Sequence, residues 1–205
     1  MCKLKSAIIL KDRIFMPDYD IHSKMLEELK ITDDYINASK VFVRAELSPE
    51  NGDVFSDIDG WKFSVDQDIT PEWFDEKDCT ERMRKAVKEW AKTHIFVGQN
   101  GLAISHGENI FIKDCKNVDI YGSATVNYIY DNATVKNIYD NATVNYIYDS
   151  ATVKNIYGNV TVISSPYTKW NNSASLIISD NATFKDCYSK TIYQAGGWKF
   201  VEVKK

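Results

Sequence analysis

The sequence predicts an α+β protein, with a small N-terminal α/β domain followed by a C-terminal β-solenoid (β-helix) of about eighteen residues per coil and a capping C-terminal strand. Three observations predict this fold. A nine-residue repeat runs from Ala124 to Val162, and a short regular period is typical of solenoids. Residues 1–97 lack this period and mix helical with strand patterns. Gly98 to Gly101 mark the boundary, so we expect a head domain at 1–97 and the solenoid with its cap at 98–205.

The repeat consists of two alternating halves. Ala-Thr-Val recurs at residues 124, 133, 142 and 151, and Val-Thr-Val follows at 160. Asn-Tyr follows the first and third triplets and Lys-Asn the second and fourth, so the full unit has eighteen residues. We expect the Ala, the Val and the Ile three residues later to point inward and the Thr outward, because side chains alternate along a strand. Asp-Asn, Asp-Ser or Gly-Asn then turns the chain.

Stacked coils about 4.8 Å apart should align equivalent side chains in rows. Tyr128 would then lie over Tyr146, and Tyr130 over Tyr148. One interpretation is that these tyrosines are ordinary outward-facing strand residues. The other is that their flat rings form a surface for binding or self-association. We therefore take the four tyrosines as candidate binding residues.

The first elements of the head domain follow from local patterns. Ser6–Leu10 is a short apolar run, and Arg13–Met16 is a second one after a Lys-Asp turn, which predicts a β-hairpin. Asp20 is placed to cap a helix that continues to about Lys30, with its apolar residues on one face. These segments predict a hairpin followed by a helix.

Two strands and a longer helix complete the head domain. In Lys40–Leu47 every second residue from Val41 is apolar, as in a half-buried strand. Trp61–Val65 alternates in the same way and predicts another strand. Thr80–Ile95 has apolar residues at helical spacing and predicts a helix that leads to the domain boundary.

The repeat loses its register after Val162. The pattern resumes at Ala182, 22 residues after Val160, which is eighteen plus four. The insertion lies within Ser164–Ser173, so we expect a loop there, with Trp170 as a candidate contact residue because exposed loops on rigid scaffolds often carry function. Gly196–Val203 is predicted to be the final strand that caps the solenoid.

The charge distribution restricts the classes of partner. Residues 1–97 carry 20 acidic and 15 basic residues and the remainder 9 and 10, so net charges of −5 and +1 sum to −4. Eleven acidic residues lie between Glu46 and Asp78, against two lysines. This segment is either a solvated acidic loop or a contact for a basic partner. Because no basic stripe is visible, we expect no direct nucleic-acid binding.

Other sequence features point to a cytoplasmic protein. No apolar run approaches the length of a membrane span, and no charged-then-apolar leader is present. The four cysteines show neither zinc-site nor disulfide spacing. Cys115 falls on the Ala position of the repeat and Cys187 on its Ile position, so both are expected to be buried. We expect no membrane association, no cofactor and no metal site.

Two groups of residues are candidates for chemistry. Cys2 directly follows Met1, and loss of Met1 would leave a free amine on a thiol residue. That arrangement resembles N-terminal-nucleophile amidohydrolases, in which the amine activates its own side chain. Asp66 and Asp68 point the same way if the preceding strand continues, and a carboxylate pair can bind a metal ion or do acid–base chemistry. The alternative is that the two aspartates are a solvated strand edge.

The Asp-Asn-Ala-Thr-Val runs from Asp131 to Val144, and again at Asp180–Phe184, resemble repeat solenoids of uncharacterised bacterial and bacteriophage proteins. The segments Lys5–Arg13 and Val65–Trp73 are similar to phage-associated proteins of the same kind. No activity comes with this resemblance. It implies a protein of the bacterial or infected-host cytosol, and small phage proteins of this kind often bind and block a host factor, such as a defence protein.

Three functional hypotheses follow. The first is a non-enzymatic protein-binding module, encoded by a bacteriophage and directed against a host protein. The second is a hydrolase or transferase that depends on Cys2. The third is a structural protein that self-associates, as a homo-oligomer, through its tyrosine rows or solenoid ends.

Overall fold

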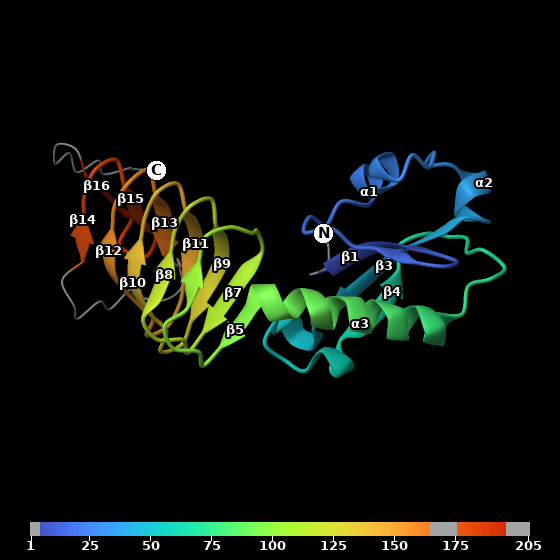
Figure 1. Cartoon of the computed structure of the whole chain (residues 1–205), viewed down its shortest axis with the longest axis horizontal. Coiled ribbons are helices and arrows are strands. Elements are labelled where there is room, and N and C mark those ends of the chain that lie inside the picture. Colours follow the sequence, from blue (N-terminus) through green and yellow to red (C-terminus); the bar gives the residue numbers. More distant parts are fainter. Residues whose placement is uncertain (1–4, 165–175, 196–205) are drawn as a thin grey trace. The chain divides into compact units, whose positions relative to one another are not determined.

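The computed structural model describes residues 5–164 and 176–195, and the chain divides into two compact units, Met1–Thr93 and His94–Lys205 (Figure 1). The first unit combines a sheet with helices and the second is a β-solenoid, which confirms the predicted fold class. The division falls four residues before the sequence boundary at 97. The reason is that Ile95–Val97 forms β5, which pairs with a solenoid strand.

The described part of the N-terminal unit contains a four-stranded antiparallel sheet. Its strands in spatial order are β2 (Ile14–Phe15), β1 (Lys5–Leu10), β3 (Phe42–Ser48) and β4 (Lys62–Val65). The predicted hairpin of the first two strands is confirmed, because Ile9 pairs with Ile14. All six residues of β1 are buried, since helices lie on both sides of the sheet (Figure 1).

The helical elements of this unit, within the described residues, are α1 (His22–Glu28), α2 (Tyr35–Ala38), α3 (Glu76–His94) and the 3-10 turns η1 (Glu50–Gly52) and η2 (Ile58–Gly60). α3 begins four residues before the predicted Thr80. The carboxylate of Asp75 accepts a hydrogen bond from the amide of Asp78 at 2.8 Å, which satisfies a free donor of the first turn. α2 is too short to show a helical period, and Asp34 caps it in the same way.

The prediction that Asp20 caps α1 is wrong. Ile21 precedes this helix and makes no capping hydrogen bond through its side chain. The carboxylate of Asp20 instead accepts from the backbone amide of Ser6 at 2.9 Å and from Nζ of Lys5 at 3.2 Å. Lys5 is fully buried. The aspartate therefore compensates a buried charge and is not available to a helix end.

The prediction that β3 is half-buried is only partly right: Val43, Ala45 and Leu47 are fully buried as predicted, but the opposite face of the strand is covered too. Phe42 and Val43 are both fully buried, whereas Val41, predicted to face inward, is 37% exposed. The strand begins only at Phe42, and a helix lies on each side of the sheet (Figure 1). Phe42 joins a core cluster with Ile8 and Met25. Alternation fails as a guide here because both faces of the sheet are covered.

The described residues of the second unit form two sheets that face each other across the solenoid core (Figure 1). The seven-stranded sheet has the order β16 (Thr191–Gln194), β15 (Thr183–Asp186), β13 (Thr161–Ser164), β11 (Thr143–Ile147), β9 (Thr125–Tyr130), β7 (Ile110–Lys113) and β5 (Ile95–Val97). The five-stranded sheet has the order β14 (Ile177–Ile178), β12 (Thr152–Ile156), β10 (Thr134–Ile138), β8 (Val118–Ile120) and β6 (Ala103–Ile104).

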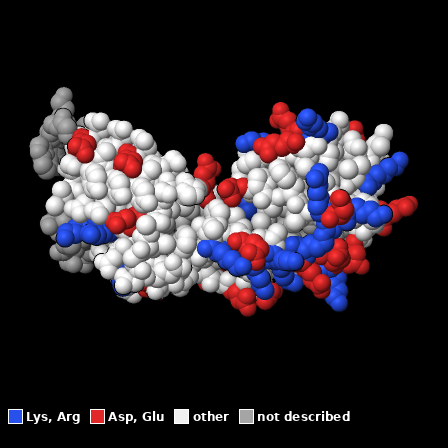
Figure 2. All heavy atoms as spheres, viewed as in Figure 1, with Lys and Arg blue, Asp and Glu red and all other residues white. Residues whose placement is uncertain are grey.

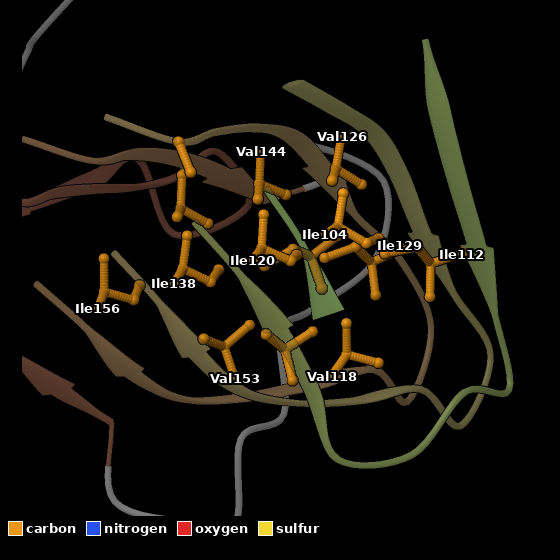
Figure 3. Close-up of a cluster of buried hydrophobic side chains, with 14 of the residues drawn as sticks. Ile104, Ile112, Val118, Ile120, Val126, Ile129, Ile138, Val144, Val153 and Ile156 are labelled. Carbon is orange, nitrogen blue, oxygen red and sulfur yellow. The ribbon is translucent and has the colours of Figure 1, made fainter. Parts of the chain in front are cut away.

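The register of the strands follows the eighteen-residue period. Thr143 pairs in parallel with Thr125 and Thr161, each eighteen residues away. Ala, Val and Ile of each half-repeat point inward, as predicted, and fill the space between the sheets (Figure 3). The buried residues of this core include Ala124, Val126, Ile129, Ala133, Val135, Ile138, Ala142, Val144 and Ile147. Each coil therefore buries its apolar side on its neighbours.

The predicted four-residue insertion is confirmed by the register on both sides of it. Thr183 pairs with Thr161 and Ile178 with Ile156, 22 residues apart in each case. The predicted loop itself and Trp170 lie outside the described residues. Cys115 is buried as predicted, but Cys187 is only half-buried, because the chain turns back there into β16.

Within the described residues, the last strand of the solenoid is antiparallel to its neighbour. β16 pairs with β15 in the opposite direction, with Tyr193 opposite Phe184. All other strand pairs described in the seven-stranded sheet are parallel. This hairpin covers the edge of β15 and caps the sheet. The segment predicted for this role, residues 196–203, lies outside the described residues.

The turns that follow the strands of the five-stranded sheet alternate glycine and aspartate. Gly122, Asp140, Gly158 and Asp180 occupy equivalent positions, all with positive φ. The amide of Gly122 donates to the carboxylate of Asp140, and that of Gly158 to the carboxylate of Asp180, both at 3.1 Å. A Cβ atom on Gly158 would lie 2.8 Å from the carbonyl oxygen of Asp140. The alternation therefore lets one coil bond to the next without a steric clash.

Replacing Gly158 with Ala should destabilise the solenoid more than replacing Gly101 with Ala. Both residues have positive φ, 84° and 74°, but a Cβ atom on Gly101 has nothing within 4 Å. The left-handed conformation costs an alanine about 1–2 kcal/mol at either site, and overpacking at residue 158 adds about 1–3 kcal/mol. Urea unfolding of both full-length variants, followed by circular dichroism, measures the difference. Equal losses would contradict the steric argument.

Candidate functional site

The four candidate tyrosines lie in two stacked rows on the seven-stranded sheet. The ring centroids of Tyr128 and Tyr146 are 5.8 Å apart, with 23° between the ring planes. Those of Tyr130 and Tyr148 are 4.7 Å apart, with 7° between the planes. Tyr128 and Tyr146 are also register partners. The predicted stacking of both rows is thus confirmed, whereas their use in binding stays a prediction.

The two rows contact each other and form one cluster of rings. Tyr128 lies 5.6 Å from Tyr130 and 5.7 Å from Tyr148, and Tyr146 lies 6.0 Å from Tyr148, measured between centroids. Phe111 extends the first row, 5.6 Å from Tyr128, and is buried. We call Tyr128, Tyr130, Tyr146 and Tyr148 the tyrosine surface. Tyr146 is its most open member, with 37% of the residue exposed.

The rings stand outward because the inward positions of the strand are taken. Val126 and Ile129 fill the core between the sheets, which leaves Tyr128 and Tyr130 on the outer side of β9. The same arrangement recurs one coil later in β11. Each ring is therefore held by its own strand and by its stacked neighbour, and little side-chain freedom remains to be lost on binding.

A row of asparagines runs beside the tyrosine surface. Nδ2 of Asn127 donates to Oδ1 of Asn109 at 2.9 Å, and Nδ2 of Asn145 donates to Oδ1 of Asn127 at 3.0 Å. Such amide ladders bond each coil to the next. Our interpretation of the sequence missed this row, although its members are spaced by eighteen residues like the tyrosines.

The five-stranded sheet carries a comparable but charged outer face. Tyr139 stacks between Tyr121 and Tyr157, with centroids 5.0 and 5.1 Å away. Burial of the hydroxyl, with Tyr157 and Tyr121 as further causes, raises the pKa of Tyr139 above 10.0. Lys136 and Lys154 are exposed on this face. Equivalent positions in β9 and β11 are Asn127 and Asn145, which carry no charge.

Charged side chains are sparse on the solenoid. On the face shown in Figure 2 they are dense over the N-terminal unit and few over the second unit. Near the tyrosine surface, Lys113 pairs in register with Tyr130, and its Nζ lies 3.2 Å from a carboxylate oxygen of Asp131. The opposite charges of Lys113 and Asp131 thus cancel at the border of the tyrosine surface. The tyrosine surface is thus aromatic, with amide side chains beside it, rather than charged.

Asp66 and Asp68, the other candidate binding residues, line one pocket of the N-terminal unit. The pocket has a volume of about 530 Å³, and its lining also includes Asp33, Asp34 and Arg44. Arg44 and Asp33 form an ion pair. The carboxylates therefore line an open, mostly acidic hollow that contains one guanidinium. No carboxylate pair isolated for acid–base chemistry is visible in this part of the described chain.

Gln67 positions this pocket, although no pattern in the sequence indicates such a role. Its Oε1 accepts from the amide of Arg44 at 2.8 Å, and its Nε2 lies 3.2 Å from the carbonyl oxygen of Phe42 and 3.3 Å from that of Ala38. Its amide group thus continues the hydrogen bonding of the sheet beyond β4. It holds the two flanking aspartates on the rim.

The structure does not describe the other two candidate residues. Cys2 and Trp170 lie outside the described residues, so the hypothesis of a Cys2 enzyme stays a prediction. Within the described chain, no helix is long and apolar enough to cross a membrane.

Comparison with known proteins adds no family assignment. No match to this chain was found among protein-family models, curated proteins or solved structures.

Proposed function

We propose that this protein is a non-enzymatic binding module that contacts a protein partner through the tyrosine surface. The observation that carries the proposal is the contact of four rings, from two successive coils, in a cluster that itself contains no charged side chain. Tyrosine supplies a large contact area at a low entropic cost, and the cores of protein interfaces are enriched in aromatic and depleted in charged residues. A stiff surface of this kind is suited to recognition.

The opposite face supports this choice by contrast. Its tyrosine row is a single line, Tyr121, Tyr139 and Tyr157, with exposed lysines nearby. An isolated row buries less area on a partner than a cluster two rows wide. Lysine is depleted in interface cores because its charge must be desolvated. The tyrosine surface is therefore the better candidate for an interface core.

The expected partner is a protein with a complementary, largely uncharged patch. The resemblance to phage-associated solenoid proteins favours a host factor, including a defence protein, and this stays a prediction. The acidic segment of the N-terminal unit offers a second, electrostatic contact for a basic region of the same partner. Aromatic anchoring would then give affinity, and the acidic segment would speed association.

Replacing Tyr128 and Tyr146 together with Ala should weaken partner binding at least tenfold, because truncation of an aromatic hot-spot residue costs about 2 kcal/mol or more, roughly 30-fold. The partner is first trapped by photo-crosslinking from Thr143, which lies on the same sheet, in bacterial lysate. Binding of the purified partner is then measured by biolayer interferometry. The matched control replaces Tyr139 and Tyr157 with Ala, which removes an equivalent stack from the other face.

The two double variants separate the possible outcomes. Equal binding by both variants and the unaltered protein would rule out the tyrosine surface as the contact. A crosslink from Thr143 to a second copy of this chain would identify the surface as a self-association interface instead. Circular dichroism and the unfolding midpoint of each variant show whether the solenoid is intact.

A further inference from the structure

Three side chains from separate parts of the N-terminal unit converge beside its pocket. His22 is the first residue of α1, Glu46 lies within β3, and Asp66 directly follows β4. The amide of Asp66 donates to the carbonyl of Arg44 at 2.9 Å, which holds its backbone next to β3. One ring nitrogen of His22 and one carboxylate oxygen from each acid all lie within 4.8 Å of one another. The fold thus brings together residues separated by 24 and 20 positions in the sequence.

The hydrogen bonding of His22 determines which ring nitrogen carries a proton. Nε2 lies 3.2 Å from the backbone carbonyl oxygen of Ala45, and a carbonyl oxygen can only accept, so Nε2 must donate. In a neutral ring Nδ1 then presents a lone pair. That lone pair faces a carboxylate oxygen of Asp66 at 3.2 Å, where two acceptors meet. The arrangement becomes favourable only if a cation lies between the two atoms or a second proton makes the ring positively charged.

This arrangement is the one that metal-binding histidines adopt. Their second ring nitrogen usually donates to a backbone carbonyl or a carboxylate, which orients the ring toward the metal. Two ligands of a tetrahedral site with bonds of about 2.1 Å lie roughly 3.4 Å apart. The distance of 3.2 Å between Nδ1 of His22 and Oδ2 of Asp66 is close to that value. The ring is therefore oriented as a ligand would be.

Burial and ligand type indicate the class of ion. Glu46 is 9% exposed, and the side chains of His22 and Asp66 are 11% and 61% exposed. The group thus has a buried floor and one open side through which an ion can enter. One imidazole nitrogen and two carboxylate oxygens suit a divalent transition metal such as Zn²⁺, whereas Ca²⁺ and Mg²⁺ prefer oxygen ligands alone.

We propose that His22, Glu46 and Asp66 bind one Zn²⁺ ion and thereby tie α1 to β3 and to the end of β4. Water would complete the coordination on the exposed side. Such an ion would add a bond from α1 to the two strands, to which His22 is joined by hydrogen bonds with Asp66 and Ala45. Because the metal binds only the folded unit, it stabilises that unit in proportion to its concentration and affinity. The site is independent of the tyrosine surface.

The test is calorimetric titration of the full-length, chelator-treated protein with Zn²⁺. We expect one ion per chain, at least tenfold weaker binding after Asp66→Asn, and unchanged binding after Asp68→Asn. Asp68 lines the same pocket but is not one of the three ligands, so this pair of variants is matched in chemistry and position. His22→Gln and Glu46→Gln should weaken binding as Asp66→Asn does.

Nitrogen-15 NMR of the ring of His22 provides a second readout. Zinc should shift the Nδ1 resonance to the range of a coordinated nitrogen and leave Nε2 protonated. Two protonated nitrogens at saturating zinc would show that a second proton supplies the positive charge, which would overturn the proposal. Absence of binding by the unaltered protein, or binding that survives all three ligand substitutions, would also overturn it.

Discussion

Replacing Asp20 with Ala should destabilise the N-terminal unit by about 3–5 kcal/mol, because it leaves a buried ammonium group without its carboxylate partner. Lys5 is fully buried, and its Nζ donates to the carbonyl of Pro17 at 2.6 Å and to the carboxylate of Asp20 at 3.2 Å. Without Asp20, this charge keeps one carbonyl oxygen, the face of Trp90 at 5.2 Å from Nζ and the more distant attraction of Asp18, but no carboxylate described in direct contact. Hydrogen exchange of the β1 amides in the full-length protein measures the loss.

A double substitution separates the cost of an unpaired charge from the value of the pair. Burial lowers the pKa of Lys5 and raises that of Asp20, against the attraction between them. Desolvation thus exceeds the Coulomb gain for both groups, so the pair itself stabilises little. Lys5→Met with Asp20→Asn should therefore cost less than Asp20→Ala alone. A double variant as unstable as the sum of its single changes would contradict this account.

The defect of Asp20→Ala should shrink as pH rises toward 10.5. Burial lowers the pKa of Lys5 below that ordinary value, and Asp20 opposes the shift. Once Asp20 is removed, the pKa of Lys5 falls further. The unfolded chain then binds the lysine proton more tightly than the folded one, so the unfolding free energy increases with pH in this range. Exchange measured at neutral and alkaline pH, corrected for the intrinsic rate, tests the sign.

Replacing Ile138 with Ala should destabilise the solenoid by about 2–5 kcal/mol, the usual cost of a cavity at a buried isoleucine. Ile138 is fully buried and lies in register between Ile120 and Ile156 (Figure 3). Both neighbours belong to adjacent coils, so the cavity weakens two coil interfaces at once. Urea unfolding followed by circular dichroism, with exchange of the β10 amides, measures the loss.

The matched control is Ile177→Ala. Ile177 lies in β14 of the same sheet but is 54% exposed, so its loss should change stability by no more than about 0.5 kcal/mol. Similar effects at the two positions would mean that burial between the sheets is not what holds the coils together.

The solenoid could be predicted in detail because the length of its repeat determines which residues pair between neighbouring coils. Once Tyr128 and Tyr146 are known to be eighteen residues apart in an eighteen-residue coil, their stacking follows. The inward Ala, Val and Ile followed in the same way, and so did the shift of four residues before Ala182. In such a stack, the spacing of residues along the sequence directly determines which residues contact each other.

The N-terminal unit was less predictable because its contacts join distant positions. The helical pattern before Lys30 suggested a cap at Asp20, but the buried lysine that uses this carboxylate lies fifteen residues earlier. His22, Glu46 and Asp66 show no ligand spacing, since a sheet and a helix bring them together. The second buried face of β3 depends on a helix that comes 28 residues after this strand ends.

The alternation of two half-repeats has a consequence for how this chain can change in length. Unequal recombination between near-identical coding segments would add or delete whole eighteen-residue coils, and every tyrosine, asparagine and lysine would stay on its own side of the molecule. A deletion of nine residues would exchange the two sides beyond the break and place lysines under asparagines and asparagines under tyrosines. Length variants that arise in nature should therefore differ by even numbers of half-repeats, with the contact area growing or shrinking one coil at a time.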